Sequence, residues 1–212
     1  MNIFLDTETG PSTRTEIAAH IARKHLPEDL ADTAKSAKAA SAELAKTSLG
    51  LFGELWVVSV AVDLEDPVTL VRSATAANGE ADLVQAVADH LGRQDLIRLR
   101  HLVAHNAPFD NDRLRHSAMR HGIRLPRQVA AQGLKPWDKS NPWFCTMQAW
   151  GSRNTSLNDI CLDLGIPLLK GDIDGSKVWD YICAGRIDEV AAYCADDVRR
   201  VRAVYQRIMG VS

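Results

Sequence analysis

The chain has 212 residues, of which 46% are hydrophobic and 25% are charged, and these values are typical of one sizeable globular domain. Its formal net charge of −2 excludes overall positive charge as the source of nucleic-acid affinity, so local patches and bound metal would have to attract a polyanionic substrate. The sequence contains no apolar run of membrane-spanning length and does not open with a signal peptide. We therefore expect one domain over residues 1–212, located in the cytoplasm.

The cysteines argue against two kinds of site. They are Cys145, Cys161, Cys183 and Cys194, and they show neither a C-x-x-C spacing nor paired histidine ligands. A zinc site or a disulfide framework is therefore not expected, and a reducing compartment fits this usage best.

The first strand is predicted at residues 3–5, a short apolar run that leads into the sequence DTETG. Side chains alternate along a strand, so Asp6 and Glu8 point to one face and Thr7 to the other. Two neighbouring carboxylates at the end of a buried strand repel each other and are costly to desolvate, and a cation between them removes both costs. A solvated strand end with two incidental acids is the alternative interpretation.

An insertion follows at about residues 13–48, rich in Ala, Lys and Glu. The pattern predicts two helices separated near Leu26 and Pro27, with the proline in the first turn of the second helix. The weak amphipathicity is also compatible with a mobile arm. In either case we expect an insertion between the first two strands and not a catalytic element.

The remaining elements follow from hydrophobic periodicity and turn signals. Strands are predicted at 55–63, 68–72 and 101–105, and helices at 79–91, 109–122, 155–164, 177–184 and 187–209. Residues 125–142 read as irregular, and residues 143–150 as a strand end or the start of a helix. Together with the first strand, the pattern predicts an α/β fold in which an antiparallel meander of three strands joins parallel strands in a mixed sheet flanked by helices.

Two further stretches carry carboxylates. HNAPFD joins a short strand to a helix and places Asp110 in the first helical turn, where a carboxylate suits the helix dipole, although a plain helix-start Asp is equally common. In YCADD, Tyr193 and Asp197 are four apart on a helix and share a face, whereas Asp196 points elsewhere. A half-buried Tyr beside an exposed Asp is the alternative for that pair.

Together, Asp6, Glu8, Asp110 and Asp197 are hard oxygen ligands suited to Mg²⁺ or Mn²⁺ rather than to zinc. Four such ligands can hold two cations roughly 3.5–4 Å apart, the arrangement used for in-line displacement at phosphate.

These three motifs in this order resemble those of the 3′→5′ exonucleases of the ribonuclease H-like (DnaQ-like) superfamily. FLDTETG is similar to their first motif, HNAPFD to the second and YCADD to the third, whose Tyr-x-x-x-Asp spacing matches the tyrosine subtype. TSLNDICLDLGIP and GSKVWDYICAGRIDEVAAYC resemble segments of the stand-alone exonucleases related to the proofreading domain of family B DNA polymerases. The insertion departs from the minimal family pattern. The resemblance implies a ribonuclease H-like fold.

The resemblance also implies an activity: hydrolysis of phosphodiester bonds from the 3′ end of single-stranded DNA, with two divalent ions (Mg²⁺ or Mn²⁺) and release of nucleoside monophosphates. By the same resemblance, Asp6, Glu8 and Asp197 ligate one metal ion, and Asp6 bridges to a second that Asp110 binds directly or through water. Tyr193 orients or deprotonates the attacking water, and its ordinary pKa of about 10 favours orientation.

Contacts to the substrate are expected from four residues outside the acidic set: Thr7, Asn106, Phe109 and Lys177. Phe109 is the first choice among the aromatic residues for stacking on a terminal base, and Trp137, Trp143 and Trp179 are the others. The basic stretch after Asp110 would either track a phosphate backbone or form a solvated helix face; it contains Arg113, Arg115, Arg120, Arg124 and Arg127.

Two other functions stay open. An exoribonuclease of the same fold would carry the same acids, because sugar discrimination depends on contacts to the 2′ position. A non-catalytic nucleic-acid-binding module would have the fold without the chemistry, which the presence of all four acids and Tyr193 argues against. The expected partner is the 3′ end of single-stranded DNA, with RNA as the alternative. A role in DNA repair or proofreading would require a polymerase or repair partner in trans.

Overall fold

A mixed β-sheet forms the centre of the computed structural model, which describes residues 1–25, 42–44, 46, 52–131, 138, 140–151, 154–168 and 173–211. The strands of this part are β1 (Asn2–Gly10), β2 (Glu54–Val62), β3 (Val68–Val71), β4 (His101–Ala104) and β5 (Trp143–Cys145). Their spatial order is β3-β2-β1-β4-β5. β1 pairs antiparallel with β2 and β2 with β3, whereas β4 runs parallel to β1 and β5 parallel to β4. The predicted meander of three plus parallel strands is confirmed.

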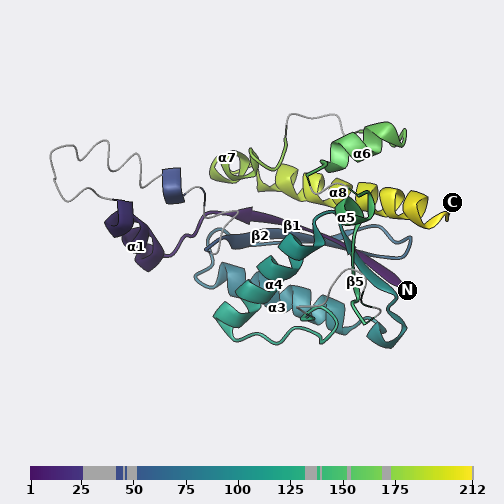
Figure 1. Ribbon diagram of the computed structural model, residues 1–212. Helices are drawn as coiled ribbons and strands as arrows, with labels where there is room; N and C mark the ends of the chain where they lie inside the picture. Colours follow the sequence, from purple (N-terminus) through teal and green to yellow (C-terminus); the bar gives the residue numbers. More distant parts are fainter. Residues whose placement is uncertain are drawn as a thin grey trace.

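β1 lies in the middle of the sheet, and its alternating side chains enter two different cores. Ile3 and Leu5 pack in the cluster under α3 (Gly79–Gly92) and α4 (Ala107–His121). Phe4 points the other way, into the cluster formed with α8 (Ile187–Met209). Figure 1 shows α8 on one side of the sheet and α3 and α4 on the other. The alternation of β1 therefore decides which layer each of its side chains faces.

The helices agree with the predictions except at some of their ends. α8 has the predicted bounds, and α4 ends at His121, just before Gly122, whose positive φ of 66° suits glycine. α4 begins two residues earlier than predicted, because Pro108 fits the first helical turn. Residues 143–150 contain both predicted alternatives, β5 followed by α5 (Thr146–Ala149). The other elements are the 3₁₀ helix η2 (Leu96–Arg98), α6 (Leu157–Asp163) and α7 (Val178–Cys183).

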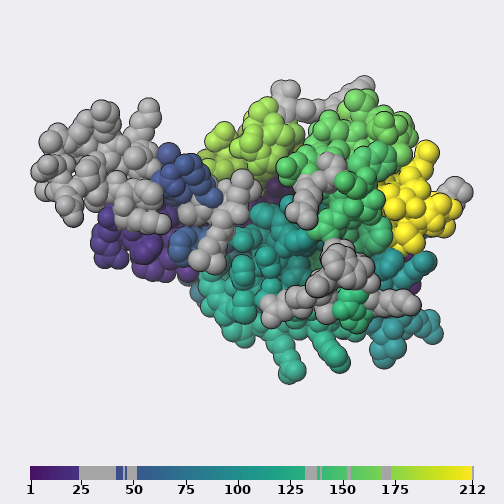
Figure 2. All heavy atoms as spheres, viewed as in Figure 1, coloured from purple at the N-terminus to yellow at the C-terminus, as the bar shows by residue number. Residues whose placement is uncertain are grey.

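The insertion begins with α1 (Thr15–His25), which confirms the first of its two predicted helices. Figure 2 shows α1, in purple, standing out from the body of the molecule near α7. The predicted break at Leu26 and Pro27 lies outside the described residues, although residues 42–44 and 46 are helical. Within the described residues, no helix combines the length and apolarity that a bilayer span requires.

Candidate active site

β1 delivers two carboxylates to the α8 side of the sheet. Asp6 pairs with Ser59 and Glu8 with Val57 across the β1–β2 ladder, and the register shifts just after Glu8. A glycine stands at position 10 because the space beside it is filled by two rings. A Cβ at Gly10 would lie 2.7 Å from both the Trp56 and Trp179 rings. The strand that carries the acids is therefore held tightly at its end.

Asp110 reaches the same place from the opposite layer. β4 runs parallel to β1 with Phe4 beside Val103, so the chain leaves β4 close to Asp6 and α4 begins there. The Asp110 side chain is buried, and Thr7 Oγ1 donates a hydrogen bond of 2.8 Å to its Oδ1. The hydroxyl of Thr7 is thus engaged with a carboxylate of the site.

α8 supplies Tyr193 and Asp197 on one face, as their spacing predicts. The Tyr193 hydroxyl is hydrogen-bonded to the buried Asp197 carboxylate, and both interact electrostatically with Asp6. Between them, Cys194 Sγ donates to the backbone carbonyl of Asp6 at 3.5 Å, which ties α8 to β1. The structure therefore brings together all five residues of the predicted catalytic set: Asp6, Glu8, Asp110, Tyr193 and Asp197.

The pKa values of these acids are all raised. For Asp6 and Glu8 burial is the main cause, and the charges of Asp110 and Asp197 add to it. Burial raises the pKa of Asp110 to about 7, although the hydrogen bonds from Thr7 oppose the shift. The pKa of Tyr193 rises above its ordinary value through burial and the neighbouring negative charges, so its hydroxyl stays protonated. Clustered acids with raised pKa values tend to hold protons unless a positive charge compensates them.

The donor set fits a divalent cation. Asp6 Oδ2 is buried and accepts no hydrogen bond from the residues that the structure describes. One ligand atom each of Asp6, Glu8 and Cys194 lie within 4.8 Å of one another. Carboxylate oxygens suit Mg²⁺ and Mn²⁺, whereas a protonated thiol does not, and burial keeps the pKa of Cys194 high. Asp6 and Glu8 are therefore the first candidates for holding a metal, with Asp110 and Asp197 close enough to interact with both.

The structure adds one cation that the motifs do not contain. Arg200 lies one turn beyond Asp197 on α8, is buried, and donates through Nη2 to Asp197 Oδ1 and through Nη1 to Asn158 Oδ1. A spacing of three on one helix is the sequence signal that relates it to Asp197. Nothing in the sequence relates it to Asn158, at the start of α6.

Of the predicted substrate contacts, Thr7, Asn106 and Phe109 lie beside Asp110, and Lys177 lies before α7. Asn106 is exposed at the N-cap position of α4, and its carbonyl accepts from Phe109 N at 2.8 Å. Phe109 is half-buried, with the Arg113 guanidinium 5.4 Å from its ring centre. Lys177 is exposed just before α7 and forms an ion pair of 3.7 Å with Asp174. Their contacts with nucleic acid stay predictions.

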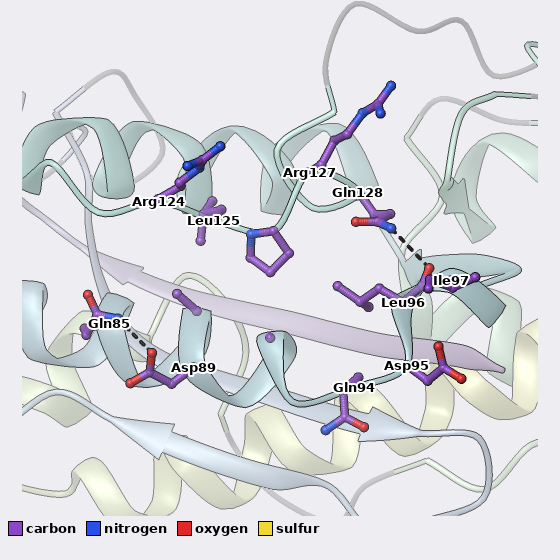
Figure 3. A pocket seen from close by; sticks show the side chains of 13 residues that line it. Gln85, Asp89, Gln94, Asp95, Leu96, Ile97, Arg124, Leu125, Arg127 and Gln128 are labelled. Atoms are coloured by element: carbon purple, nitrogen blue, oxygen red, sulfur yellow. Dashed lines mark hydrogen bonds between the residues drawn. The ribbon is translucent and has the colours of Figure 1, made fainter.

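The basic stretch after Asp110 is largely taken up by interactions within the protein. Arg113 is buried, Arg115 pairs with Asp112 at 3.0 Å, and Arg120 pairs with the buried Glu80 at 2.8 Å. The two arginines nearest its C-terminal end line an open groove of about 540 Å³ between α3 and the segment after α4 (Figure 3); they are Arg124 and Arg127. No acid of the cluster lines this groove. Arg113 and Arg120 are therefore held within the protein, and they fit neither a phosphate track nor a solvated helix face.

Two other aromatic or imidazole side chains also have structural partners. Trp143 is buried in the core, with its Nε1 3.4 Å from the carbonyl of Val129. His105 lies between Thr146 Oγ1 at 3.1 Å and the carbonyl of Thr155 at 3.0 Å. Trp137 lies outside the described residues, whereas Trp179 is half-buried against Trp56.

Comparison with known protein families gives a match over most of the chain. The model of a family described as a predicted 3′-5′ exonuclease related to the exonuclease domain of PolB matches residues 54–212. The match includes Asp110, Tyr193, Asp197 and Arg200 and begins after β1, so Asp6 and Glu8 lie outside it. No curated protein matches the chain.

Proposed function

Since the chain belongs to the family of predicted 3′-5′ exonucleases related to the PolB exonuclease domain, we propose that it hydrolyses terminal phosphodiester bonds at the 3′ end of single-stranded DNA and releases nucleoside monophosphates. The observation that carries the proposal is the convergence of four carboxylates whose pKa values are all raised; they are Asp6, Glu8, Asp110 and Asp197. A protein interior tolerates such a cluster when positive charge enters it.

In this proposal, Asp6, Glu8 and Asp197 would hold one divalent ion, and Asp6 and Asp110 would hold a second. The ions, Mg²⁺ or Mn²⁺, would lower the pKa of bound water and stabilise the leaving 3′ oxygen. Thr7 fixes the direction of the Asp110 carboxylate through its 2.8 Å hydrogen bond. The acids from β1 and α8 are held in register by the Cys194 contact with Asp6.

The role that we propose for Tyr193 is to orient the attacking water. Its hydroxyl is hydrogen-bonded to Asp197 and lies in the field of Asp6 and Glu8. Because burial and those negative charges raise its pKa, it serves as a hydrogen-bond donor and not as a base. The water proton would pass instead to solvent, because the four carboxylates would be engaged with the two ions.

The terminal nucleotide would contact residues around the acids. Asn106 and Phe109 flank Asp110 at the start of α4, where a polar side chain and a half-buried ring are available to a sugar and a base. Thr7 and Lys177 complete the proposed contacts. The four cysteines are all free, which supports a reducing compartment such as the cytoplasm. We place the activity in DNA repair or in proofreading beside a polymerase in trans.

The test is degradation of matched 5′-labelled DNA and RNA oligomers with Mn²⁺, Mg²⁺ or EDTA. We expect a ladder that shortens from the 3′ end of single-stranded DNA with either metal and none with EDTA. Asp6→Ala and Asp197→Ala should each abolish it, and Asp196→Ala, which changes the neighbouring acid, should not. Faster cleavage of RNA would favour the exoribonuclease, and intact binding without cleavage would favour the non-catalytic module.

A further inference from the structure

Arg200 is a buried arginine whose side chain has few partners. It is 6% exposed, and its two terminal nitrogens donate to Asp197 Oδ1 and Asn158 Oδ1. Its Nε is buried and has no hydrogen-bond partner among the residues that the structure describes. A buried guanidinium usually has most of its five donors satisfied, so the incomplete set here indicates that burial alone does not explain this residue.

The charge of Arg200 acts on the acid cluster. Its positive charge opposes the rise in the pKa of Asp197, with which it is paired, and also the rise in the pKa of Asp6 on β1. The carboxylates have the opposite effect on one another, because each negative charge raises the pKa of its neighbours. Arg200 therefore supplies positive charge in the place where the proposed function requires a metal ion.

The Asp197 carboxylate would interact with two cations, the Arg200 guanidinium and the proposed metal ion. Asp197 Oδ1 accepts from Arg200, and Asp197 is one of the proposed metal ligands. A divalent ion at Asp197 would compete with the guanidinium for the carboxylate oxygens and would be repelled by its charge. Asn158, at the exposed start of α6, gives the guanidinium a second partner that a metal would not take.

We propose that Arg200 is a built-in counter-cation of the acid cluster, which neutralises Asp197 in the metal-free protein and must give up part of that contact when metal binds. The inference rests on the proposed function, because it assumes that the cluster binds a divalent ion. It makes Arg200 a positioning residue that sets the metal affinity, since the guanidinium reaches the proposed metal ligands and not the reacting atoms.

The competing explanation is that Arg200 only orients Asp197 for the metal. The two explanations predict opposite effects of removing the charge. If Arg200 only orients its partner, its loss weakens metal binding. If Arg200 competes with the metal, its loss tightens metal binding, because the cluster then carries one more uncompensated negative charge.

The experiment is calorimetric titration of the full chain with Mn²⁺, without nucleic acid, in the wild type, Arg200→Gln, Arg200→Lys and Arg199→Gln. Arg199 is the matched control, because it is the adjacent residue but is exposed and pairs with Asp196. We expect Arg200→Gln to bind Mn²⁺ roughly tenfold more tightly, within the usual range of coupling between sites. Arg200→Lys keeps the charge and should stay close to the wild type, as should Arg199→Gln.

Thermal unfolding gives the second measurement. In EDTA, Arg200→Gln should unfold at a lower temperature than the wild type. Mn²⁺ should raise the unfolding temperature of this variant by more than it raises that of the wild type. Weaker Mn²⁺ binding by Arg200→Gln would overturn the proposal in favour of simple orientation. If Arg200→Gln does not fold, a tenfold change in the Mn²⁺ affinity of Arg200→Lys would overturn the proposal. A wild type that binds no Mn²⁺ would instead overturn the proposed function.

Discussion

Thr7 Oγ1 donates a hydrogen bond of 2.8 Å to Asp110 Oδ1 and so joins the middle of β1 to the first turn of α4. Thr7 lies between Asp6 and Glu8 but points to the opposite face of the strand, since neighbouring side chains alternate. The strand therefore contributes to the site on both faces, with carboxylates on one and a donor for the third carboxylate on the other. The bond opposes the effect of burial on the pKa of Asp110.

Replacing Thr7 by valine should change the pH dependence of hydrolysis. Valine keeps the shape of the side chain and removes only the hydroxyl. Since a hydrogen bond to a charged group contributes about 1.5–3 kcal/mol, its loss should raise the pKa of Asp110 by about one unit. We expect the acidic limb of kcat/KM to move to higher pH by that amount.

The control is Thr7→Ser, which keeps a hydroxyl and should keep the wild-type profile. An acidic limb of Thr7→Val that coincides with that of the wild type would mean that Asp110 does not govern the pH dependence. The profile is measured with a labelled single-stranded oligomer at a fixed Mn²⁺ concentration below saturation, where protonation of Asp110 competes with metal binding.

The metal-free protein should lose stability as the pH rises through neutrality. The Asp110 pKa is about 7 in the folded protein and lies near 3.9 in an unfolded chain, so the folded state binds more protons between these values. The free energy of unfolding therefore falls as pH increases across this window. Across this interval the Asp110 effect is about 0.8 kcal/mol, so in EDTA we expect the unfolding temperature to be about 2–3 °C lower at about pH 8 than at about pH 6.5.

Asp110→Asn separates this effect from those of other groups. Half-buried histidines such as His101 and His105 have lowered pKa values, and they make stability rise with pH below about pH 6.5. The asparagine variant keeps the histidines and should show a flatter profile above that pH. An identical slope in the two proteins would contradict the assignment, and saturating Mn²⁺ should flatten the wild-type profile as well.

Local patterns are enough to predict much of this site. The positions of Asp6, Thr7 and Glu8 follow from the alternation of a strand, and the shared face of Tyr193 and Asp197 follows from helical spacing. These relationships depend on residues close in sequence. The first residue of α4 is harder to predict from the sequence, because a proline often ends a helix but also fits the first turn of one. Pro108 lies in the first turn of α4.

Contacts between distant segments could not be predicted. The Thr7–Asp110 bond spans 103 residues and the Arg200–Asn158 contact spans 42, and no periodicity relates either pair. The space around Gly10 depends in the same way on Trp56 and Trp179, which come from β2 and α7. Such pairings depend on how the helices pack on the sheet, and the sequence around each residue does not determine that packing.

Glu54 anchors the segment that follows β1, and its loss should destabilise the fold. Its buried carboxylate accepts from Thr13 Oγ1 at 2.7 Å, from Ser12 Oγ at 2.9 Å and from Arg72 Nη1 at 2.7 Å. These bonds overcome the effect of burial and hold its pKa at about 2. Glu54→Gln leaves Arg72 without its counter-charge, and we expect a loss of about 3 kcal/mol in the free energy of unfolding.

Urea unfolding at neutral pH measures that loss. The matched control is Glu65→Gln, which changes an exposed glutamate and should stay within about 0.5 kcal/mol of the wild type. Because the folded pKa of Glu54 is depressed, its contribution is present above about pH 4.5 and is lost as the pH falls toward 2. Equal stability of the two variants at neutral pH would contradict the anchoring role.

Tyr193→Phe should lower turnover and leave binding almost unchanged. The hydroxyl is bonded to Asp197, and its pKa lies above the ordinary value, so at neutral pH it donates a hydrogen bond and takes up no proton. Losing one oriented donor near the reacting water should reduce kcat roughly tenfold to a hundredfold, with KM within about twofold. Steady-state cleavage of a labelled oligomer measures both.

Tyr181→Phe is the matched control, because Tyr181 lies on α7 with its ring 4.1 Å from the Arg186 guanidinium and should not affect turnover. The pH profile gives a second criterion. A tyrosine that stays protonated contributes no alkaline limb, so wild type and Tyr193→Phe should differ in height but not in shape. If the substitution removed an alkaline limb, Tyr193 would be acting as an acid that titrates, and if it left kcat unchanged, the hydroxyl would have no part in the reaction.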